Sequence, residues 1–261
     1  MLKLVLLSDI HGNLKKCRLA VKMANRNNAS IIVAGDLMNW ELKHPDTNFK
    51  KQLNILSKCR KKAYIIPGSH EEGKLYKWIG SHKLSKYDNL VDLNRKIIDL
   101  KTHYLIGYGG SSVIEDSIIS KSYYRSIPED DELMLNQLLS IKGKPVIFVS
   151  HDPPYSYLDT AIFRKLKLKN KKLLGIEPAE KVKKGAIEKS VGQKVLKKLA
   201  EKHKPLLYLF GHIHESAGYE ELITHKAVKV SKHLLINAGI ENVYLADVNK
   251  NWVKILGITR V

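Results

Sequence analysis

Five short apolar runs divide this chain, and each stops at a turn of glycine, serine or proline that carries an aspartate or a histidine. The runs cover residues 4–7, 31–34, 63–66, 146–149 and 206–210. Apolar runs of this length, bounded by turn-forming residues, are typical of buried β-strands. In an open sheet of parallel strands, the carboxyl ends meet at one edge, where ligands bind. The pattern therefore predicts an α/β fold in which the polar side chains after each run converge on one site.

The side chains that end these runs have the chemistry of metal ligands. Asp9 and His11 follow the first run two positions apart, so both can face the same site. The candidate set consists of Asp9, His11, Asp36, His151, His212 and His214, with Ser69 and His70 after the third run. Carboxylate oxygens and imidazole nitrogens suit divalent ions such as Mn²⁺, Fe²⁺, Zn²⁺ or Ni²⁺, and a shared aspartate can bridge two of them. Two such ions activate a bridging water for attack on phosphorus.

The segments between the runs set the expected architecture. Apolar residues recur at helical spacing over residues 14–26, and further helices are expected over 49–57, 71–79, 129–139 and 191–203. Short strands are expected within 96–100 and 103–107 and, without helices between them, over 227–230, 234–238, 244–247 and 253–258. Strand–helix units followed by strands alone favour two packed sheets over one doubly wound sheet. With 261 residues, 44% of them hydrophobic, and no linker, we expect one domain over 1–261.

Neither membrane insertion nor export is indicated. No apolar run approaches the roughly 20 residues of a membrane span. The N-terminus leads directly into the first apolar run, without the basic segment and cleavage site of a signal peptide. We therefore expect a soluble, cytoplasmic protein, and no pattern indicates an oligomeric state.

The two cysteines exclude a disulfide framework and a cysteine-based zinc site. Cys17 lies at helical spacing with Leu14 and Val21 and is expected in the core. Cys59 stands between Lys58 and Arg60, whose charges would favour a thiolate, but an exposed residue without a role is the expected outcome.

The chain is strongly basic, because its 45 Lys and Arg residues exceed its 26 Asp and Glu residues by 19. Such a charge attracts partners that carry phosphate, including nucleotides, nucleic acids and anionic lipid headgroups. Lysine-rich surfaces are also common in proteins from hot environments, so a thermophile-like surface is the competing interpretation, and the charge alone favours it over specific nucleic-acid binding. The basic segment 156–189 is expected to be a long irregular insertion, either a substrate-binding lid or a solvated surface.

The ordered motifs resemble those of calcineurin-like metallophosphoesterases. The resemblance rests on Asp9-Ile10-His11, Gly35-Asp36, Gly68-Ser69-His70-Glu71, Ser150-His151 and Gly211-His212-Ile213-His214. Each motif alone is weak, but the ordered set over residues 9–214 is specific. Smaller similarities at Asn13, Pro153-Pro154 and Asn237-Ala238-Gly239 resemble the compact, stand-alone members. The resemblance implies a four-layer α/β/β/α sandwich of two mixed sheets flanked by helices, with a site for two metal ions at the sheet rim.

The resemblance also implies a role for each site residue. One metal ion would be held by Asp9, His11, Asp36 and His214, and Asp36 would bridge to a second ion held by His151, His212 and the position of Ser69. His70 would lie near the leaving-group oxygen, as a proton donor or as a stabiliser of the phosphate.

Two positions depart from the family pattern. The family usually has asparagine where Ser69 stands, and the shorter, neutral hydroxyl is a poorer ligand, so the second metal site is expected to be the weaker one. Asn39 stands where the family often has aspartate, and it can still form hydrogen bonds behind the ligands. We expect Glu71 to provide a favourable charge at the start of a helix and not to bind metal.

Three functions follow from these observations. The first is a metal-dependent hydrolase of phosphomonoesters or phosphodiesters, small molecules or nucleotides, in which a metal-bridging hydroxide attacks without a covalent intermediate. The second, suggested by Ser69, is a catalytically weak or inactive metal-binding module on the same fold. The third, suggested by the charge alone, is a nuclease. Substrate specificity is expected to lie in the loops 40–48, 111–125 and 156–189.

Overall fold

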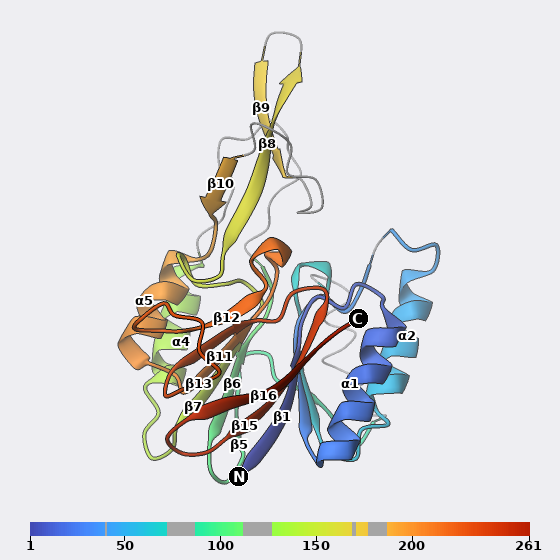
Figure 1. The fold of residues 1–261 in the computed structure, drawn as a ribbon, viewed down its shortest axis with the longest axis vertical. Coiled ribbons are helices and arrows are strands. Elements are labelled where there is room, and N and C mark those ends of the chain that lie inside the picture. Colours follow the sequence, from blue (N-terminus) through green and yellow to red (C-terminus); the bar gives the residue numbers. More distant parts are fainter. Residues whose placement is uncertain (40, 72–86, 112–126, 169–170, 177–186) are drawn as a thin grey trace.

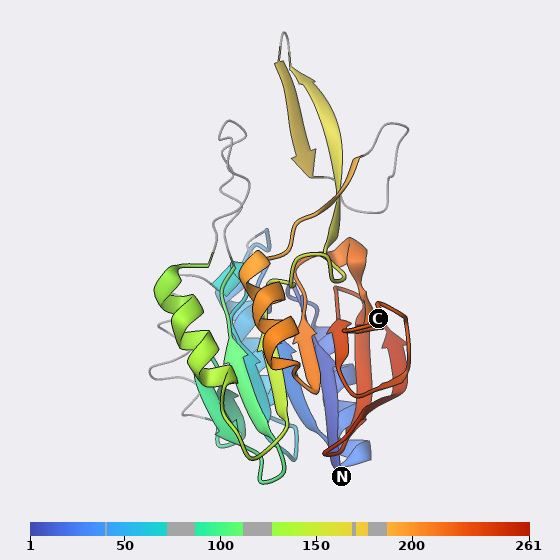
Figure 2. The ribbon, with the colours of Figure 1, turned by 90° about the vertical axis from the view of Figure 1, so that its left-hand side faces the viewer.

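The structure of the protein is a computed structural model of residues 1–261, and it describes all of them except residues 40, 72–86, 112–126, 169–170 and 177–186. Two β-sheets pack face to face, and a pair of helices covers the outer face of each sheet (Figures 1 and 2). The central parallel strands of each sheet are therefore buried on both faces, whereas strands near the edge keep exposed side chains, as in β16 (Val253–Arg260). This arrangement confirms the predicted four-layer α/β/β/α sandwich of two mixed sheets.

The first sheet contains, among the described residues, strands in the order β13-β16-β15-β1-β2-β3-β4. These are β1 (Leu2–Leu7), β2 (Ser30–Ala34), β3 (Ala63–Ile66), β4 (Leu90–Asp92), β13 (Val230–Ser231), β15 (Asn242–Val248) and β16 (Val253–Arg260). Strands β1 to β4 are parallel, and β15 pairs with β1 in the antiparallel direction. The side chains from Leu4 to Leu7 are all buried, which explains the unbroken apolar run of a strand covered on both faces.

The second sheet has the order β12-β14-β11-β7-β6-β5. Its strands are β5 (Lys96–Asp99), β6 (Tyr104–Tyr108), β7 (Val146–Ser150), β11 (Leu207–Phe210), β12 (Gly218–Glu221) and β14 (Leu234–Asn237). Strands β6, β7, β11 and β14 are parallel, and β5 and β6, the two short strands predicted within 96–100 and 103–107, pair as a hairpin. An apolar layer that includes Leu6, Ile32, Val149 and Leu209 fills the space between the two sheets.

Helices α1 (Leu14–Asn27) and α2 (Pro45–Leu56) cover the first sheet, and α4 (Glu129–Leu139) and α5 (Lys194–His203) cover the second. Helix α1 begins where the Asn13 side chain accepts hydrogen bonds from the backbone N–H groups of Lys15 and Lys16. Helix α2 begins earlier than predicted, because Pro45 is suited to the first helical position. The helix predicted over 71–79 lies outside the described residues apart from Glu71, which ends a 3₁₀ turn, η1 (Ser69–Glu71).

The expectation that residues 156–189 are irregular is wrong. They contain β8 (Thr160–Leu168), β9 (Lys171–Ile176) and β10 (Ile187–Ser190), which form a three-stranded arm that projects from the sandwich (Figures 1 and 2). The alternation Lys-Leu-Lys-Leu over 165–168 is typical of a strand and is the sequence pattern that indicates β8. Both ends of the arm are joined at Asp159, whose buried carboxylate accepts hydrogen bonds from Ser190 Oγ and, at 2.7 Å, from the N–H of Gly192.

The expectation that Cys59 is exposed is also wrong. Its side chain is only 4% exposed, because the turn after α2 folds the thiol under β2, 3.8 Å from the carbonyl oxygen of Ala29. Burial raises the pKa of this thiol, and Cys17 is buried in the core as predicted. Within the described part of the chain, no helix combines the length and the apolar character that crossing a bilayer requires.

Candidate metal centre

All eight predicted site residues lie at one rim of the sandwich. They occupy the turns that follow β1, β2 and β3 of the first sheet and β7 and β11 of the second. Because these strands run parallel within each sheet, their carboxyl ends reach the same rim. Residues that are up to 203 positions apart in the chain therefore come into direct contact.

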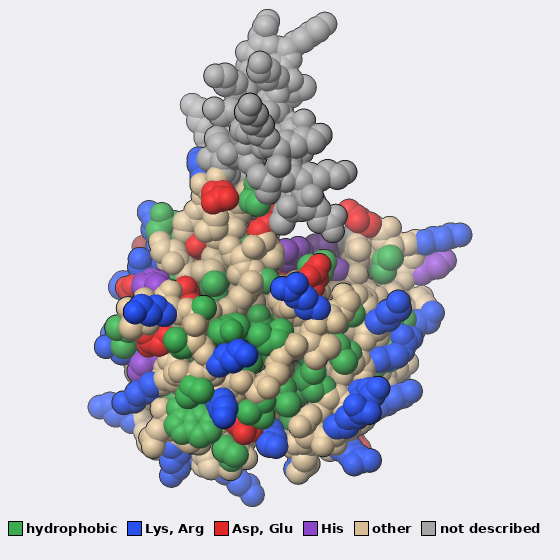
Figure 3. Space-filling view, in the orientation of Figure 1, with side chains coloured by type: hydrophobic (Ala, Val, Ile, Leu, Met, Phe, Trp, Pro, Cys, Tyr) green, Lys and Arg blue, Asp and Glu red, His purple; other side chains and the backbone are tan. Residues whose placement is uncertain are grey.

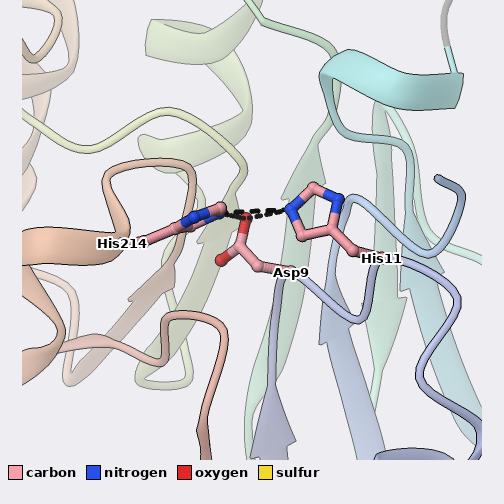
Figure 4. A group of neighbouring side chains, drawn as sticks. All are labelled: Asp9, His11 and His214. Carbon is pink, nitrogen blue, oxygen red and sulfur yellow. Dashed lines mark hydrogen bonds and ion pairs between the residues drawn. The ribbon is translucent and has the colours of Figure 1, made fainter. Parts of the chain in front are cut away.

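Three of these residues form a compact set that we call the Asp9 group: Asp9, His11 and His214 (Figure 4). The Nε2 atom of His214 lies 3.4 Å from Asp9 Oδ1 and 3.2 Å from the Nε2 atom of His11. The distance from His11 Nε2 to Asp9 Oδ1 is 4.0 Å. Two imidazole nitrogens and a buried carboxylate thus point at one small volume.

Three others form the Asp36 group: Asp36, His151 and His212. The Nε2 atom of His151 lies 3.2 Å from Asp36 Oδ2, and the His151 and His212 rings stand edge to face with their centres 5.0 Å apart. The same Asp36 oxygen lies 3.9 Å from His11 Nε2. Asp36 therefore stands between the two groups, at the place of a bridging carboxylate.

Ser69 and His70 contact the shared carboxylate from the end of β3. Ser69 Oγ donates to Asp36, with distances of 2.9 Å to Oδ2 and 3.2 Å to Oδ1, and the N–H of His70 donates to Oδ1 at 2.8 Å. The His70 ring stands edge to face with the ring of His11, 4.7 Å between centres. The Ser69 hydroxyl thus contacts the carboxylate that stands between the two groups, and its direct binding of a metal ion stays a prediction.

Backbone carbonyls fix the orientation of two of the imidazoles. The Nδ1 atom of His151 lies 2.8 Å from the carbonyl oxygen of Ala34, and the Nδ1 atom of His11 lies 3.3 Å from that of Met38. Because a carbonyl can only accept, Nδ1 carries the proton in both rings. In the neutral form of each ring, which is the form that binds a metal ion, the lone pair is then on Nε2, which faces the site.

The backbone at the site is held in a conformation that is rare for residues with a side chain. Asp9, His11, Asp36 and His212 have φ values of 49°, 43°, 51° and 70°. Each left-handed residue of this kind costs about 1–3 kcal/mol and persists only where its surroundings fix it. Here the N–H of His11 donates to the carbonyl of Asp36, and the N–H of His212 donates to the Asp9 carboxylate at 3.0 Å.

Three glycines let the strand ends approach so closely. A Cβ atom at Gly211 would lie 1.7 Å from Ser8 Oγ and 2.3 Å from Asp9 Oδ2, and one at Gly68 would lie 2.2 Å from Asp36 Oδ1. One at Gly35, where φ is +90°, would lie 2.6 Å from His151 Nδ1. The glycines that precede Asp36, Ser69 and His212 are therefore a spatial requirement of the site.

The charges of the site are strongly coupled. Burial opposes ionisation of Asp9 and Asp36, but the neighbouring histidines outweigh it and lower the pKa of both carboxyls. Burial also disfavours the imidazolium of His151, yet the negative charge of Asp36 overcomes it and raises the pKa of His151 to about 10. Burial lowers the pKa of His11 and of His212. Asp9 and Asp36 are thus ionised, and their negative charges favour a positive charge among the surrounding imidazoles.

The sequence profile of the family described as calcineurin-like phosphoesterase matches residues 2–216 of this chain, which include every site residue named above. The chain belongs to the calcineurin-like phosphoesterases. A comparison with curated protein sequences finds no match.

Solved structures share the fold of this phosphoesterase at low sequence identity. The crystal structure of TT1561 from Thermus thermophilus is 17% identical, with a TM-score of 0.64 and 97% of each chain covered. A hypothetical protein from Thermus thermophilus is 10% identical, with a TM-score of 0.51, and the match covers 100% of this chain and 98% of that one. These likenesses support the sandwich fold over the whole chain.

The donor atoms of the phosphoesterase fit divalent cations. Donors that share a cation at about 2.1 Å lie at most about 4.2 Å from one another, and the 3.2–4.0 Å distances of the Asp9 group satisfy this limit. In the Asp36 group, His151 Nε2 is buried, faces a carboxylate and has no hydrogen-bond partner. A cation beside Asp36 would supply the missing partner, so both groups fit the metal ions that the family typically binds.

Glu71 is the residue whose role the sequence did not reveal. It is fully buried, and its carboxylate accepts hydrogen bonds from the N–H groups of Asp36 (3.0 Å), Gly68 (2.8 Å) and Met38 (2.7 Å). It therefore ties the turn after β2 to the turn after β3. We expected Glu71 to be a charge at the start of a helix, but its carboxyl group is a buried anchor for backbone N–H groups. Its place next to His70 in the third motif was the only indication in the sequence that it belongs to the site.

Proposed function

We propose that this phosphoesterase hydrolyses phosphomonoesters or phosphodiesters with two divalent cations, one held by the Asp9 group and one by the Asp36 group. The observation that carries the proposal is the position of Asp36, whose Oδ2 atom lies 3.2 Å from His151 Nε2 and 3.9 Å from His11 Nε2. A carboxylate in that place can hold two cations a few ångströms apart, as dinuclear phosphoesterases require. The basic surface, with its excess of 19 positive charges, favours the approach of an anionic substrate (Figure 3).

The side chains of the site divide the work of such a hydrolysis. Bound cations would supply Lewis-acid polarisation of a phosphoryl oxygen and a lower pKa for a coordinated water. The carbonyls of Ala34 and Met38 keep the Nε2 atoms of His151 and His11 aimed at the site. Ser69 and the N–H of His70 hold the Asp36 carboxylate in place. The His70 ring, which contacts the ring of His11, would deliver a proton to the leaving oxygen.

The test is hydrolysis of bis(p-nitrophenyl) phosphate by metal-free protein supplied with Mn²⁺, compared with the Asp36→Asn variant. The variant keeps the size of the side chain but loses the bridging charge, so turnover should fall by at least about 100-fold. Asp130→Asn, on the exposed surface of α4, is the matched control and should keep full activity. Folded protein without turnover under any divalent ion, or full activity of Asp36→Asn, would refute the proposal.

The geometry of Ser69 supports one second candidate, a metal-binding module with weak or absent catalysis. Its hydroxyl is engaged with Asp36, which leaves the Asp36 group with three candidate donors. This function predicts about one metal ion per chain, no turnover and no gain in the Ser69→Asn variant. Metal analysis after equilibrium dialysis separates the two functions, because a second ion and higher turnover in Ser69→Asn would identify an enzyme with a weak second site.

A further inference from the structure

A lysine lies fully buried behind the metal centre. The Lys16 side chain in the first turn of α1 is 0% exposed. Its ammonium donates to three backbone carbonyls at short distance, those of Ser8 at 2.5 Å, Gly239 at 2.7 Å and Ile240 at 2.8 Å, and the carbonyl of Asp9 lies farther away at 3.5 Å. Lysine is almost never fully buried, because desolvation of an ammonium costs several kcal/mol. The three acceptors match its three donors and make this burial tolerable.

The carbonyls bound by Lys16 belong to two separate loops. Ser8 precedes Asp9 at the end of β1, whereas Gly239 and Ile240 form the turn between β14 and β15. The ammonium therefore joins the loop that carries Asp9 and His11 to a turn more than 200 positions away, as the 223-residue separation from Gly239 shows.

Asn237 extends this connection to the other histidines. Its Oδ1 accepts the N–H of Gly239 at 3.1 Å, and its Nδ2 donates to the carbonyl of Ile213 at 2.9 Å. Ile213 stands between His212 and His214, and the N–H of His212 donates back to the Asp9 carboxylate. The contacts thus close a ring that runs from the Asp9 loop through Lys16, the β14–β15 turn and Asn237 to the His212–His214 loop.

This ring encloses strained backbone. Asp9, His11 and His212, with φ values of 49°, 43° and 70°, lie on the two loops that the ring joins. Left-handed residues of this kind relax toward ordinary conformations unless neighbouring contacts over-determine them. The buried ammonium of Lys16 supplies such a contact, because it binds carbonyls of both the Asp9 loop and the β14–β15 turn.

We propose that Lys16 is a positioning residue, whose ammonium holds the Asp9 loop against the β14–β15 turn and thereby sets the affinity of the Asp9 group for a divalent cation. The inference rests on the proposed function in one respect, that the Asp9 group binds a cation. The alternative role of Lys16, as a fixed positive charge near Asp9, has the opposite consequence. Removal of a nearby positive charge strengthens the binding of a cation, whereas loss of a positioning contact weakens it.

The experiment measures the dissociation constant of Mn²⁺ by calorimetry on metal-free full-length protein, at a temperature where circular dichroism shows each variant folded. In Lys16→Met the side chain keeps its length and loses the ammonium, and the dissociation constant should rise about 10- to 100-fold, as for other groups that orient ligands. Lys22→Met, on the exposed face of the same helix, should stay within about twofold of wild type. An unchanged or smaller dissociation constant in Lys16→Met overturns the proposal.

Two further measurements make the result specific. Asn237→Ala should weaken Mn²⁺ binding as well. The double variant Lys16→Met/Asn237→Ala should lose less binding free energy than the two single variants together, because both residues act in one ring of contacts. In metal-free protein, the amide of His212 should exchange with solvent at least about tenfold faster in Lys16→Met, while amides of β3 stay unchanged. If wild type binds no Mn²⁺, the proposed function fails, and the His212 exchange rate still decides whether Lys16 positions the loop.

Discussion

Two buried charges behind the metal-ligand candidates act on the backbone. The Glu71 carboxylate accepts N–H groups from the turns that carry Asp36 and Gly68, and the Lys16 ammonium binds carbonyls next to Asp9. The carboxyl group thus binds backbone donors, and the ammonium binds backbone acceptors. Burial and the charge of Asp36 raise the pKa of Glu71 to about 7, so above that pH its hydrogen bonds are charge-assisted and stronger than neutral ones.

The Glu71→Gln variant should be substantially less stable than wild type. Both carboxylate oxygens accept N–H groups, so the amide of glutamine leaves at least one backbone donor facing another donor. A buried donor without a partner costs about 1–3 kcal/mol, more next to a lost charge, so we expect a loss of about 2–4 kcal/mol in the free energy of unfolding. Urea denaturation measures it, with the exposed Glu41→Gln as control. A loss no larger than that of the control would show that Glu71 is not an anchor.

Glu220 predicts a pH dependence of stability away from the site. Burial, with the charge of Asp159 adding to it, raises the pKa of Glu220 to about 7, and its Oε1 atom has no hydrogen-bond partner. The folded state therefore binds the proton more tightly than the unfolded state, whose glutamate pKa is about 4.3. This contribution to stability is complete below about pH 4.3 and is lost as the pH rises through 7.

The Glu220→Gln variant removes this titration. Its free energy of unfolding should exceed that of wild type at pH 8, and the difference should shrink as the pH falls toward 5, because wild-type Glu220 is then protonated. Urea denaturation at pH 5, 6, 7 and 8 checks this, with the exposed Glu188→Gln of β10 as control. A difference that does not vary with pH would contradict the assignment.

Single residues were predictable where their type is unusual for their place. An aspartate or histidine directly after a buried strand is costly without a partner, so Asp9, Asp36 and His151 could be assigned to one site from the sequence. Lys16 lies in a basic stretch with helical spacing, and Glu71 is the last residue of the third motif. Charged side chains in such places are usually exposed. Their burial depends on carbonyl and N–H groups from distant loops, which no local pattern contains.

The strand ends are the elements on which the site depends, and glycine makes their approach possible. In Gly211→Ala, the new Cβ atom would overlap Ser8 Oγ and Asp9 Oδ2, so the Asp9 carboxylate must move. A displacement of about 1 Å can cost about 100-fold in rate, and overpacking costs about 1–3 kcal/mol, so we expect losses of that order in Mn²⁺-dependent turnover and in stability. Gly257→Ala is the matched control, because nothing lies within 4 Å of its Cβ position. Equal behaviour of the two variants would refute the packing argument.

Element types were easier to predict than their limits. The buried strands and α1 follow strong periodic patterns, and both were found where expected. The start of α2 was not predicted correctly, because Pro45 lies outside the apolar pattern. The strands of the arm were not predicted either, because the lysines of β8 suggested a solvated loop. The edge strand β12 was missed as well, since its Gly-Tyr-Glu-Glu sequence has no apolar alternation.

The whole molecule brings the site together across two sheets. Asp9, Asp36 and His70 come from the first sheet, and His151, His212 and His214 come from the second, so the metal centre exists only once the sheets have packed. The sequence predicted two sheets because strands without helices fill its C-terminal part. It did not predict which strand pairs with which, and the antiparallel pairing of β15 with β1 is set by contacts about 240 residues apart, such as Leu6 with Tyr244.

The charge of the whole molecule leads to the last prediction. The arm segment 160–176 contains no acidic residue and six basic ones, Arg164, Lys165, Lys167, Lys169, Lys171 and Lys172. The stretch 50–62 is equally basic, but it belongs to the sandwich, whereas the arm projects from it (Figure 1). Lys167 and Lys172 are partners in the register of β8 and β9. Like charges at directly opposite positions of a strand pair are unfavourable, and an anionic partner offsets this cost. A single-stranded nucleic acid should therefore bind to the arm in preference to the rest of the basic surface.

Fluorescence anisotropy of a labelled 20-nucleotide single strand, titrated between 50 and 300 mM salt, measures this binding. Reversal of three arm charges, Lys165→Glu, Lys167→Glu and Lys172→Glu, should reduce the slope of log affinity against log salt by about two, since each phosphate contact contributes about 0.7. The control reverses three exposed lysines elsewhere, Lys22, Lys58 and Lys142. Equal losses in both triple variants would mean that the charge acts as a diffuse, thermophile-like surface. Unchanged hydrolysis of bis(p-nitrophenyl) phosphate in the arm variant would place nucleic-acid affinity outside the metal centre, because the small substrate needs only the site at the rim.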